Sequence, residues 1–350
     1  MDNTKKVFRE IEADAMLTVS EDLRKYLTGF GSSFGYVYTD AQESIFFTDP
    51  RYIEGAKSAL KGELISVEVA QSEASVLEYI KSKKVKKLAV PVNRLTVPNA
   101  EILKKFRFKV VDSSPAFEKL MSVKNEEEMS LIRKACEIAE KAYSEFLGFL
   151  REGISETESA GYLEYLMRKY GAEDRSFQTI VAFGKNTSVP HHAPDETSLK
   201  KGMPVLLDFG CRYKGYCSDM TRTFLFGKGD NAEFCDIYEA VYGAHMRAFE
   251  NIHSGMTGRA ADALARDYLK TKGLDKFFTH SLGHGIGINI HEFPRLSVSS
   301  NDVLKDGYVF SVEPGVYFEG KFGIRIEDSV YLENGKVYSF MNTDKKLMTL

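Results

Sequence analysis

The chain has 350 residues, a formal net charge of −3 at pH 7 and a hydrophobic fraction of 43%. This length predicts two domains with ample core, and the near-neutral charge argues against a dedicated nucleic-acid binder. No apolar run approaches the roughly 18 residues that a membrane span needs, and the N-terminal segment lacks the apolar core of a signal peptide. The four sparse cysteines form no CxxC pair, so we expect a cytoplasmic protein with reduced thiols and no membrane partner.

The first 115 residues alternate helical patterns with short apolar runs, which is typical of an α/β domain. A turn cluster follows and predicts a domain boundary just beyond it, so we divide the chain into residues 1–120 and 121–350. The helices expected in the first domain are 4–27, 50–61, 72–82 and 98–107, and the expected strands are 44–48, 64–69 and 87–91.

The second domain contains a weak internal repeat. Residues 151–171 align without gaps on residues 253–273, and each copy follows a predicted long helix, over 125–150 and 232–252. Each copy also precedes a strand-rich region, so the order of elements favours a duplicated half-domain.

The first half of this repeat contains a hairpin with two acidic residues. Strands at 204–210 and 216–224 flank a turn that we place at 213–214, and this register sets Asp208 directly opposite Asp219. Asp208 interrupts an otherwise apolar strand, which predicts burial, and a buried carboxylate needs a partner.

The second half repeats this arrangement. Strands at 308–313 and 323–328 flank a turn centred on Gly320, which sets Glu313 opposite Glu327. Carboxylates this close repel each other unless a positive group lies beside them. Either each pair faces solvent or bonds an arginine such as Arg222 or Arg325, or the four convergent acids bind two divalent cations.

All histidines lie in one segment of the chain, between residues 191 and 291. They are His191, His192, His245, His253, His280, His284 and His291. His245 and His253 lie on or just after a predicted helix, and we expect structural or surface roles for them. The others flank the first acidic hairpin or occupy a glycine-rich segment whose backbone can approach a ligand closely. Acids with a histidine match oxygen-rich ligation of manganese, cobalt, iron or zinc, and two such ions can activate water against a carbonyl.

Four motifs resemble those of the pita-bread metallopeptidases, the M24-type family that includes aminopeptidase P, prolidase and methionine aminopeptidase. These motifs are DFGCRYKGYCSDMTRT, HSLGHGIGINIHEFP, SVEPGVY and GIRIEDSV. The resemblance covers residues 124–345 and implies an α+β pita-bread catalytic domain with an internal pseudo-twofold repeat. By this resemblance the metal ligands are Asp208, Asp219, His284, Glu313 and Glu327, with Thr221 as a partner of the ligands. They would hold two divalent metal ions per chain, with manganese the first expectation ahead of cobalt, zinc or iron. Because all five are present, a metal-free creatinase-like activity is disfavoured.

The resemblance also implies roles for residues around the metals. His191 and His291 would contact the substrate, and His291 would stabilise the carbonyl oxygen in the transition state. Glu313 would shuttle a proton for the hydroxide that bridges the two metals. His280 and Arg325 match the proline-specific branch of the family, in which they would bind substrate or order the site.

The first domain indicates which branch the chain resembles. Aminopeptidase P and prolidase possess an α/β domain here, which methionine aminopeptidases usually lack, and the segment LRKYLTGF at 23–30 resembles its opening. The resemblance therefore implies a creatinase-type domain with a mixed sheet and flanking helices, which caps the site and supports a homodimer.

This branch implies hydrolysis of the N-terminal Xaa-Pro bond of a peptide with proline at its second position. A prolidase restricted to Xaa-Pro dipeptides is the alternative, and it would need a positive group, such as Arg325 or a histidine, for the free carboxylate of the dipeptide. A non-catalytic pita-bread binding protein is a remote alternative, because such proteins commonly lose metal ligands.

Overall fold

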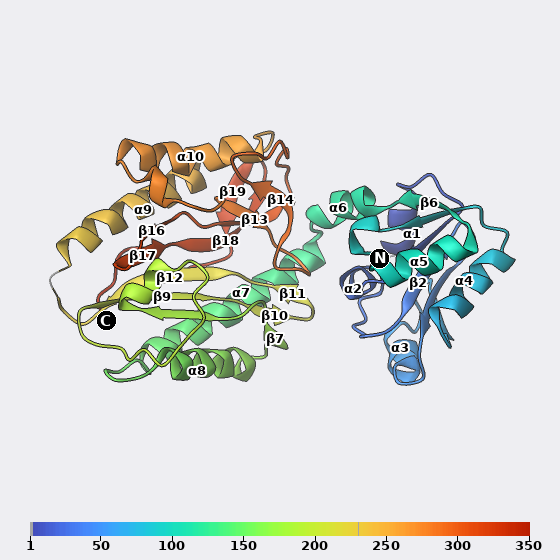
Figure 1. Ribbon diagram of the computed structural model, residues 1–350, viewed down its shortest axis with the longest axis horizontal. Coiled ribbons are helices and arrows are strands. Elements are labelled where there is room, and N and C mark those ends of the chain that lie inside the picture. The colour runs from blue at the N-terminus through green and yellow to red at the C-terminus, as the bar shows by residue number, and fades with distance from the viewer. Residues whose placement is uncertain (1–2, 230) are drawn as a thin grey trace. The chain divides into compact units, whose positions relative to one another are not determined.

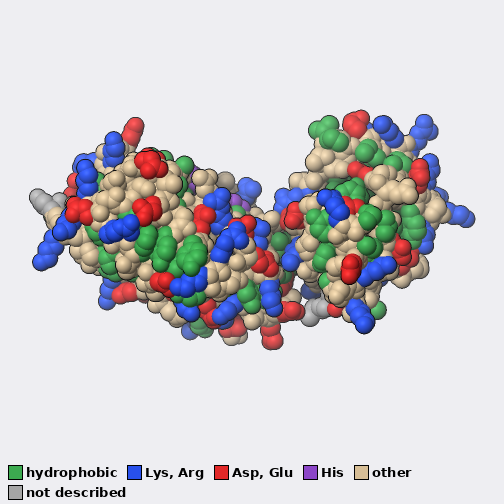
Figure 2. Space-filling model, turned by 90° about the horizontal axis from the view of Figure 1, so that it is seen from below, with side chains coloured by type: hydrophobic (Ala, Val, Ile, Leu, Met, Phe, Trp, Pro, Cys, Tyr) green, Lys and Arg blue, Asp and Glu red, His purple; other side chains and the backbone are tan. Residues whose placement is uncertain are grey.

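The structure is a computed structural model that describes residues 3–229 and 231–350 (Figure 1). Residues 1 and 2 lie outside the described residues. They belong to the N-terminal segment in which the sequence shows no apolar core of a signal peptide. The chain divides into two compact units, the first ending at Met121 and the second beginning at Ser122. None of the described helices is both long enough and apolar enough to cross a membrane. Acidic and basic side chains are interspersed over the face of each unit that Figure 2 shows.

Within the described residues, the first unit contains a six-stranded mixed sheet in the order β4-β3-β2-β1-β5-β6 with helices around it. The pairs β1–β2 and β2–β3 are antiparallel, whereas β3–β4, β1–β5 and β5–β6 are parallel. The strands are β1 (Ala15–Thr18), β2 (Tyr36–Asp40), β3 (Ser44–Thr48), β4 (Ser66–Val69), β5 (Lys87–Val90) and β6 (Lys109–Asp112). The helices are α1 (Asn3–Phe8), α2 (Glu21–Thr28), α3 (Ile53–Ala59), α4 (Glu73–Ser82), α5 (Val97–Phe106) and α6 (Ser114–Ser122), with the 3-10 turn η1 (Val92–Arg94). The predicted α/β domain with a mixed sheet is therefore confirmed.

The prediction of one helix over residues 4–27 is wrong, because this segment contains α1 and α2 separated by the strand β1. β1 lies between β2 and β5 in the sheet, and all four of its residues are buried. A strand that is buried on both faces has a continuous apolar run, which periodicity alone does not distinguish from a helix. The elements β2, β6 and α6 also lie outside the predicted set.

The second unit, over residues 122–229 and 231–350, contains an eight-stranded sheet whose path is β14-β13-β15-β18-β12-β9-β8, with β19 paired to β18. Two small sheets, β16–β17 and β11-β10-β7, accompany it. The helices are α7 (Glu126–Leu147), α8 (Glu156–Lys169), α9 (Ala232–Asn251) and α10 (Gly258–Thr271), with η2 (Gly184–Ser188) and η3 (Asp275–Phe277). The first strands are β7 (Asp174–Arg175), β8 (Ile180–Phe183), β9 (Met203–Phe209), β10 (Cys211–Tyr213), β11 (Tyr216–Cys217) and β12 (Met220–Phe226). The later strands are β13 (Gly283–Gly285), β14 (Glu292–Leu296), β15 (Val309–Val312), β16 (Gly315–Phe318), β17 (Phe322–Arg325), β18 (Glu327–Glu333) and β19 (Lys336–Ser339).

The predicted internal repeat is confirmed by the helices. In the alignment of 151–171 on 253–273, the first and last residues of α8 fall on the first and last residues of α10. The N-caps Ser155 and Thr257 each accept a hydrogen bond from the third residue of the helix that follows. Figure 1 shows α7 with α8 along one margin of the unit and α9 with α10 along the other, with the strands between them.

The first acidic hairpin has a register that differs from the prediction by two residues. Its turn is Lys214-Gly215, and both residues have positive φ, as a type I′ turn requires. Asp208 consequently pairs with Thr221 and not with Asp219. A shift of two residues preserves the alternation of side chains between the faces of a strand, so this error does not move the acids to opposite faces.

The second acidic hairpin has the predicted register. The β15–β18 ladder and the β16–β17 ladder are both centred on Gly320. Glu313 and Glu327 therefore oppose each other at the point where the chain passes from one ladder to the other.

Candidate metal centre and active site

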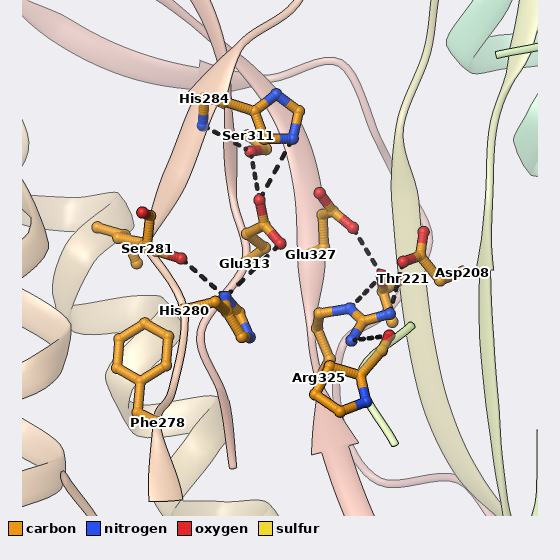
Figure 3. Close-up of polar contacts among 12 residues, drawn as sticks. Asp208, Thr221, Phe278, His280, Ser281, His284, Ser311, Glu313, Arg325 and Glu327 are labelled. Atoms are coloured by element: carbon orange, nitrogen blue, oxygen red, sulfur yellow. Dashed lines mark hydrogen bonds and ion pairs between the residues drawn. The ribbon is translucent and has the colours of Figure 1, made fainter. Parts of the chain in front are cut away.

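The five candidate metal ligands belong to, or directly flank, five strands that are neighbours in the large sheet, in the order β13, β15, β18, β12 and β9. In that order they are His284 in β13, Glu313 after β15, Glu327 in β18, Asp219 before β12 and Asp208 in β9. One ligand candidate per strand places these side chains in a row across the sheet, and Figure 3 shows four of them turned toward a common space.

The side chains of Asp219, His284 and Glu327 form the tightest group, with one ligand atom of each within 4.8 Å of the others. The Nε2 atom of His284 lies 3.6 Å from Asp219 Oδ2 and 3.4 Å from Glu313 Oε1. Asp208 is held differently, since its Oδ2 accepts a hydrogen bond from Arg325 Nη2 at 2.5 Å. Its Oδ1 is buried and has no hydrogen-bond partner among the described residues.

The electrostatics of this group favour a bound cation. Burial, together with repulsion from neighbouring carboxylates, raises the pKa of Asp219 and of Glu327 well above the usual range. Burial raises the pKa of Glu313 to about 8, with Arg325 opposing the rise and Asp208 adding to it. Burial lowers the pKa of His284 to about 4, so its imidazole is neutral and can serve as a ligand. Buried acids that lack sufficient positive charge, an unpartnered carboxylate oxygen and a neutral histidine together fit a divalent metal site.

Hydroxyl groups orient the candidate ligands. The Oγ1 of Thr221 donates a hydrogen bond to Glu327 Oε2 at 2.6 Å, as its assignment as a ligand partner implies. Ser311 Oγ donates to Glu313 Oε1 at 3.0 Å and accepts from the backbone N–H of His284 at 3.1 Å. Sequence reasoning missed Ser311. Such outer contacts fix the orientation of ligand side chains.

Arg325 is buried and connects several parts of the site (Figure 3). Besides Asp208, it donates hydrogen bonds to Thr221 Oγ1 at 3.1 Å, to the hydroxyl of Tyr317 at 2.6 Å and to the carbonyl oxygen of Pro190 at 3.3 Å. The Tyr317 hydroxyl also lies 2.9 Å from His280 Nε2. Sequence reasoning missed Tyr317, whose only signal is its place at the end of the SVEPGVY motif.

The ring of His280 is engaged within the protein at both nitrogens, since its Nδ1 lies 2.8 Å from the carbonyl oxygen of Ser281. Burial and the nearby Arg325 lower the pKa of His280 to about 3. Within the described residues, both ring nitrogens of His280 and the guanidinium of Arg325 therefore contact oxygen atoms of the protein.

His191 and His291 are exposed, and within the described residues their rings make no hydrogen bond. The ring centroid of His291 lies 4.3 Å from that of His284. His191 directly follows Pro190, whose carbonyl oxygen accepts a hydrogen bond from Arg325, so both histidines lie close to residues of the acidic group. Partial desolvation of the His291 ring, together with the nearby His191, lowers the pKa of His291. These are the two candidate site histidines with ring atoms available to a substrate.

The remaining histidines are His192, His245 and His253. His192 Nε2 lies 2.6 Å from Glu156 Oε2. His245 is fully buried on α9 and stacks against Phe249, while His253 is exposed after the end of that helix.

Comparisons with known proteins agree with this geometry. The Metallopeptidase family M24 matches residues 130–334, and the Creatinase/Prolidase N-terminal domain matches residues 1–123. An uncharacterized peptidase of Bacillus subtilis is 35% identical over 360 residues, which cover 100% of this chain and 99% of the relative. The solved structure of an Xaa-Pro dipeptidase from Bacillus anthracis has a TM-score of 0.94 at 36% identity and covers 100% of this chain and 99% of its own. That of an X-Pro aminopeptidase from Thermotoga maritima has a TM-score of 0.91 at 32% identity and covers 98% and 99%.

Proposed function

The chain belongs to metallopeptidase family M24, and from that membership we propose that it is a metal-dependent Xaa-Pro aminopeptidase. The coarser statement, a metal-dependent exopeptidase of the Xaa-Pro class, follows from the family and from relatives of both kinds at 32% to 36% identity. The finer choice is ours, and it places peptides longer than two residues among the substrates.

We assign the metals to Asp208, Asp219, His284, Glu313 and Glu327. Bound there, two divalent ions, with manganese our first choice, supply Lewis-acid polarisation of the scissile carbonyl and a nucleophilic water at neutral pH. His291 and His191 present unengaged ring nitrogens beside these acids, and we assign them to the substrate carbonyl oxygen and to substrate contact. We also assign Glu313 to proton transfer, because its carboxylate lies among the candidate ligands, with its Oε1 3.4 Å from Nε2 of His284.

The aminopeptidase assignment is carried by the contacts of Arg325. A dipeptidase must pair the free carboxylate of its substrate with a positive group, and Arg325 is the cation at the centre of the site. Its guanidinium instead donates to Asp208, to the hydroxyl of Tyr317 and to two further oxygen atoms of the protein. A guanidinium engaged in this way orders the site and does not select for a substrate carboxylate.

One observation favours the dipeptidase alternative. Arg295 pairs directly with His284 across β13 and β14, and directly opposed residues in antiparallel strands project from the same face. Arg295 is exposed, so its guanidinium is a second possible partner for a dipeptide carboxylate.

The test compares three substrates on protein stripped with a chelator and reloaded separately with manganese, cobalt, zinc or iron. We expect cleavage of Xaa-Pro-Yaa peptides that depends on added metal, and no cleavage of a methionyl peptide without proline. Cleavage of Xaa-Pro dipeptides alone, lost selectively in Arg295→Ala and retained in part by Arg295→Lys, would establish the dipeptidase instead. Cleavage of only the methionyl peptide would contradict both.

We also propose that residues 1–120 act as a cap and dimerisation domain of a cytoplasmic homodimer, which the match to the Creatinase/Prolidase N-terminal domain supports. Light scattering of the full chain is expected to give the mass of two chains, and a monomer at micromolar concentration would contradict the dimer.

A further inference from the structure

The loop that follows β8 carries two adjacent histidines with different surroundings. His191 is exposed and directly follows Pro190, whose carbonyl oxygen accepts a hydrogen bond from Arg325 at 3.3 Å. His192 contacts a different element: its Nε2 lies 2.6 Å from Oε2 of Glu156, the first residue of α8. Glu156 is fully buried.

The carboxylate of Glu156 is saturated with hydrogen bonds from this loop. Its Oε1 accepts from the backbone N–H of Phe183 at 2.6 Å and from Asn186 Nδ2 at 3.0 Å. Its Oε2 accepts from the backbone N–H of Asp195 at 3.0 Å as well as from the ring of His192. These donors come from both ends and from the interior of residues 183–195, so one buried side chain holds the whole loop to α8.

The hydrogen bonds of Glu156 decide whether the cluster of Glu156, His192 and Asp195 is a cation site or an anchor for the loop. Glu156, His192 and Asp195 place one ligand atom each within 4.8 Å of one another, which would suit a cation. A carboxylate, however, has about four lone-pair positions, and each oxygen of Glu156 already accepts two hydrogen bonds. No position is left for a metal, so the cluster is a hydrogen-bonded anchor.

The opposite side of the same loop is tied to the active site. Thr187 Oγ1 accepts a hydrogen bond from the backbone N–H of Gly323 at 2.9 Å, and the carbonyl oxygen of Pro190 accepts from Arg325. In the chain, His191 therefore lies between residues that are bound to Glu156 on α8 and residues that are bound to β17.

We propose that Glu156 is a positioning residue of the peptidase, which holds the 183–195 loop so that His191 meets the substrate. The proposal rests on the proposed function, in which His191 contacts the peptide. Because Glu156 lies outside the candidate metal ligands, its loss should act through His191 and should leave metal content unchanged.

The principal test is Glu156→Gln, with Glu158→Gln as the matched control. Glutamine keeps the size of the side chain but replaces one acceptor oxygen by a donor, so at least one of the four donors loses its partner. We expect kcat/KM for the Xaa-Pro substrate to fall about 10- to 100-fold, as for other residues that orient a site group, with full metal content. Glu158 lies on the same helix but is exposed, and Arg151 is the one side chain among the described residues with which its carboxylate pairs. Its variant should therefore retain wild-type activity.

A double-mutant cycle separates positioning from general damage. In a His191→Ala background, Glu156→Gln should change kcat/KM by no more than about twofold, because its effect acts through His191. The proposal is overturned if Glu156→Gln lowers kcat/KM equally in the wild-type and His191→Ala backgrounds. It is also overturned if the Glu156→Gln enzyme is as active as wild type. Should the wild-type protein cleave only a peptide without proline, the proposed function fails, and the same cycle measured on that peptide still decides the role of Glu156.

A second pair of variants covers the case in which Glu156→Gln does not fold. His192→Ala removes one donor to Glu156, whereas the amide of His192→Gln can replace it. We expect His192→Ala to lose activity and His192→Gln to recover at least part of it. Equal activities of these two variants would contradict the anchor.

Discussion

Two acidic residues that are adjacent in β18 have opposite electrostatic environments. Glu327 faces the candidate metal site, where burial and the carboxylates of Glu313 and Asp208 raise its pKa. Asp328 points to the other face of the strand, where Arg222 and Lys345 outweigh the effect of burial and lower its pKa to about 2.

The contacts of Asp328 explain this difference. Its Oδ1 accepts a hydrogen bond from Arg222 Nη2 at 2.8 Å, and its Oδ2 accepts from Ser339 Oγ and lies 2.7 Å from Lys345 Nζ. Asp328 is thus neutralised by cations of its own chain, whereas the Glu327 face has four acids around one arginine. An acidic face short of positive charge is suited to external cations, and a paired acid is suited to holding the fold together.

Among the variants that distinguish the Glu327 face of β18 from the Asp328 face, we expect Glu327→Gln to have the largest effect. We expect peptidase activity to fall to background and metal content to drop, because a ligand is removed. The metal-free protein should unfold at an unchanged or higher urea concentration, because one of several repelling buried acids becomes neutral. Glu333→Gln, at the exposed end of the same strand, is the control for all three measurements. A Glu327→Gln protein with full activity would remove this residue from the metal site.

Asp328→Asn is expected to have the complementary effect. Breaking a buried ion pair leaves Arg222 and Lys345 uncompensated, which costs about 3–5 kcal/mol in the free energy of unfolding. Urea denaturation measures this loss, and the exposed Asp344→Asn should stay within about 0.5 kcal/mol of wild type. A loss below about 1 kcal/mol would show that Asp328 contributes little to stability.

Protons and metal ions should compete for the carboxylates on the Glu327 face of β18. In the metal-free protein the pKa of Glu313 is about 8, and those of Asp219 and Glu327 are raised, so these groups hold protons that metal binding must displace. Metal affinity should therefore fall as the pH is lowered below about 8, by about tenfold per pH unit for each proton displaced. Calorimetry in buffers of different ionisation enthalpy counts the released protons. An affinity that does not change between about pH 6 and pH 8 would contradict the raised pKa values.

The smallest of these effects concerns His245, which lies near the Asp328 cluster. Burial lowers its pKa from 6.5 to about 3, and neither ring nitrogen has a hydrogen-bond partner among the described residues. The unfolded chain binds this proton more tightly than the folded chain, so its contribution to stability is present above about pH 6.5 and is lost as the pH falls.

Between pH 7 and pH 5, His245 should cause the wild-type protein to lose about 2 kcal/mol of its free energy of unfolding. The His245→Phe variant should not show this part of the loss. Urea unfolding at both pH values measures this difference, and the exposed His253→Asn should leave the pH dependence unchanged. A His245→Phe protein that keeps the wild-type pH dependence would contradict the lowered pKa.

The type of each domain could be predicted from the amino-acid sequence alone, as could the internal repeat and the register of the second acidic hairpin. These features depend on local signals, namely periodicity, a symmetric turn at Gly320 and motifs that keep acids and histidines at set spacings. The first hairpin illustrates the limit of such signals, because its turn could be placed at 213–214 or at 214–215. In the structure Lys214 and Gly215 both have positive φ, which places the turn at 214–215.

Which distant groups meet depends on how the elements pack against one another. β1 is a strand because it lies between β2 and β5, although its short buried run also suits a helix. Glu156 has the sequence features of a helix start, and its hydrogen bonds to residues 183–195 arise only when α8 lies beside that loop. Tyr317 likewise meets His280 across the site. Local patterns specify single elements, whereas these hydrogen bonds join residues that only the packing of several elements brings together.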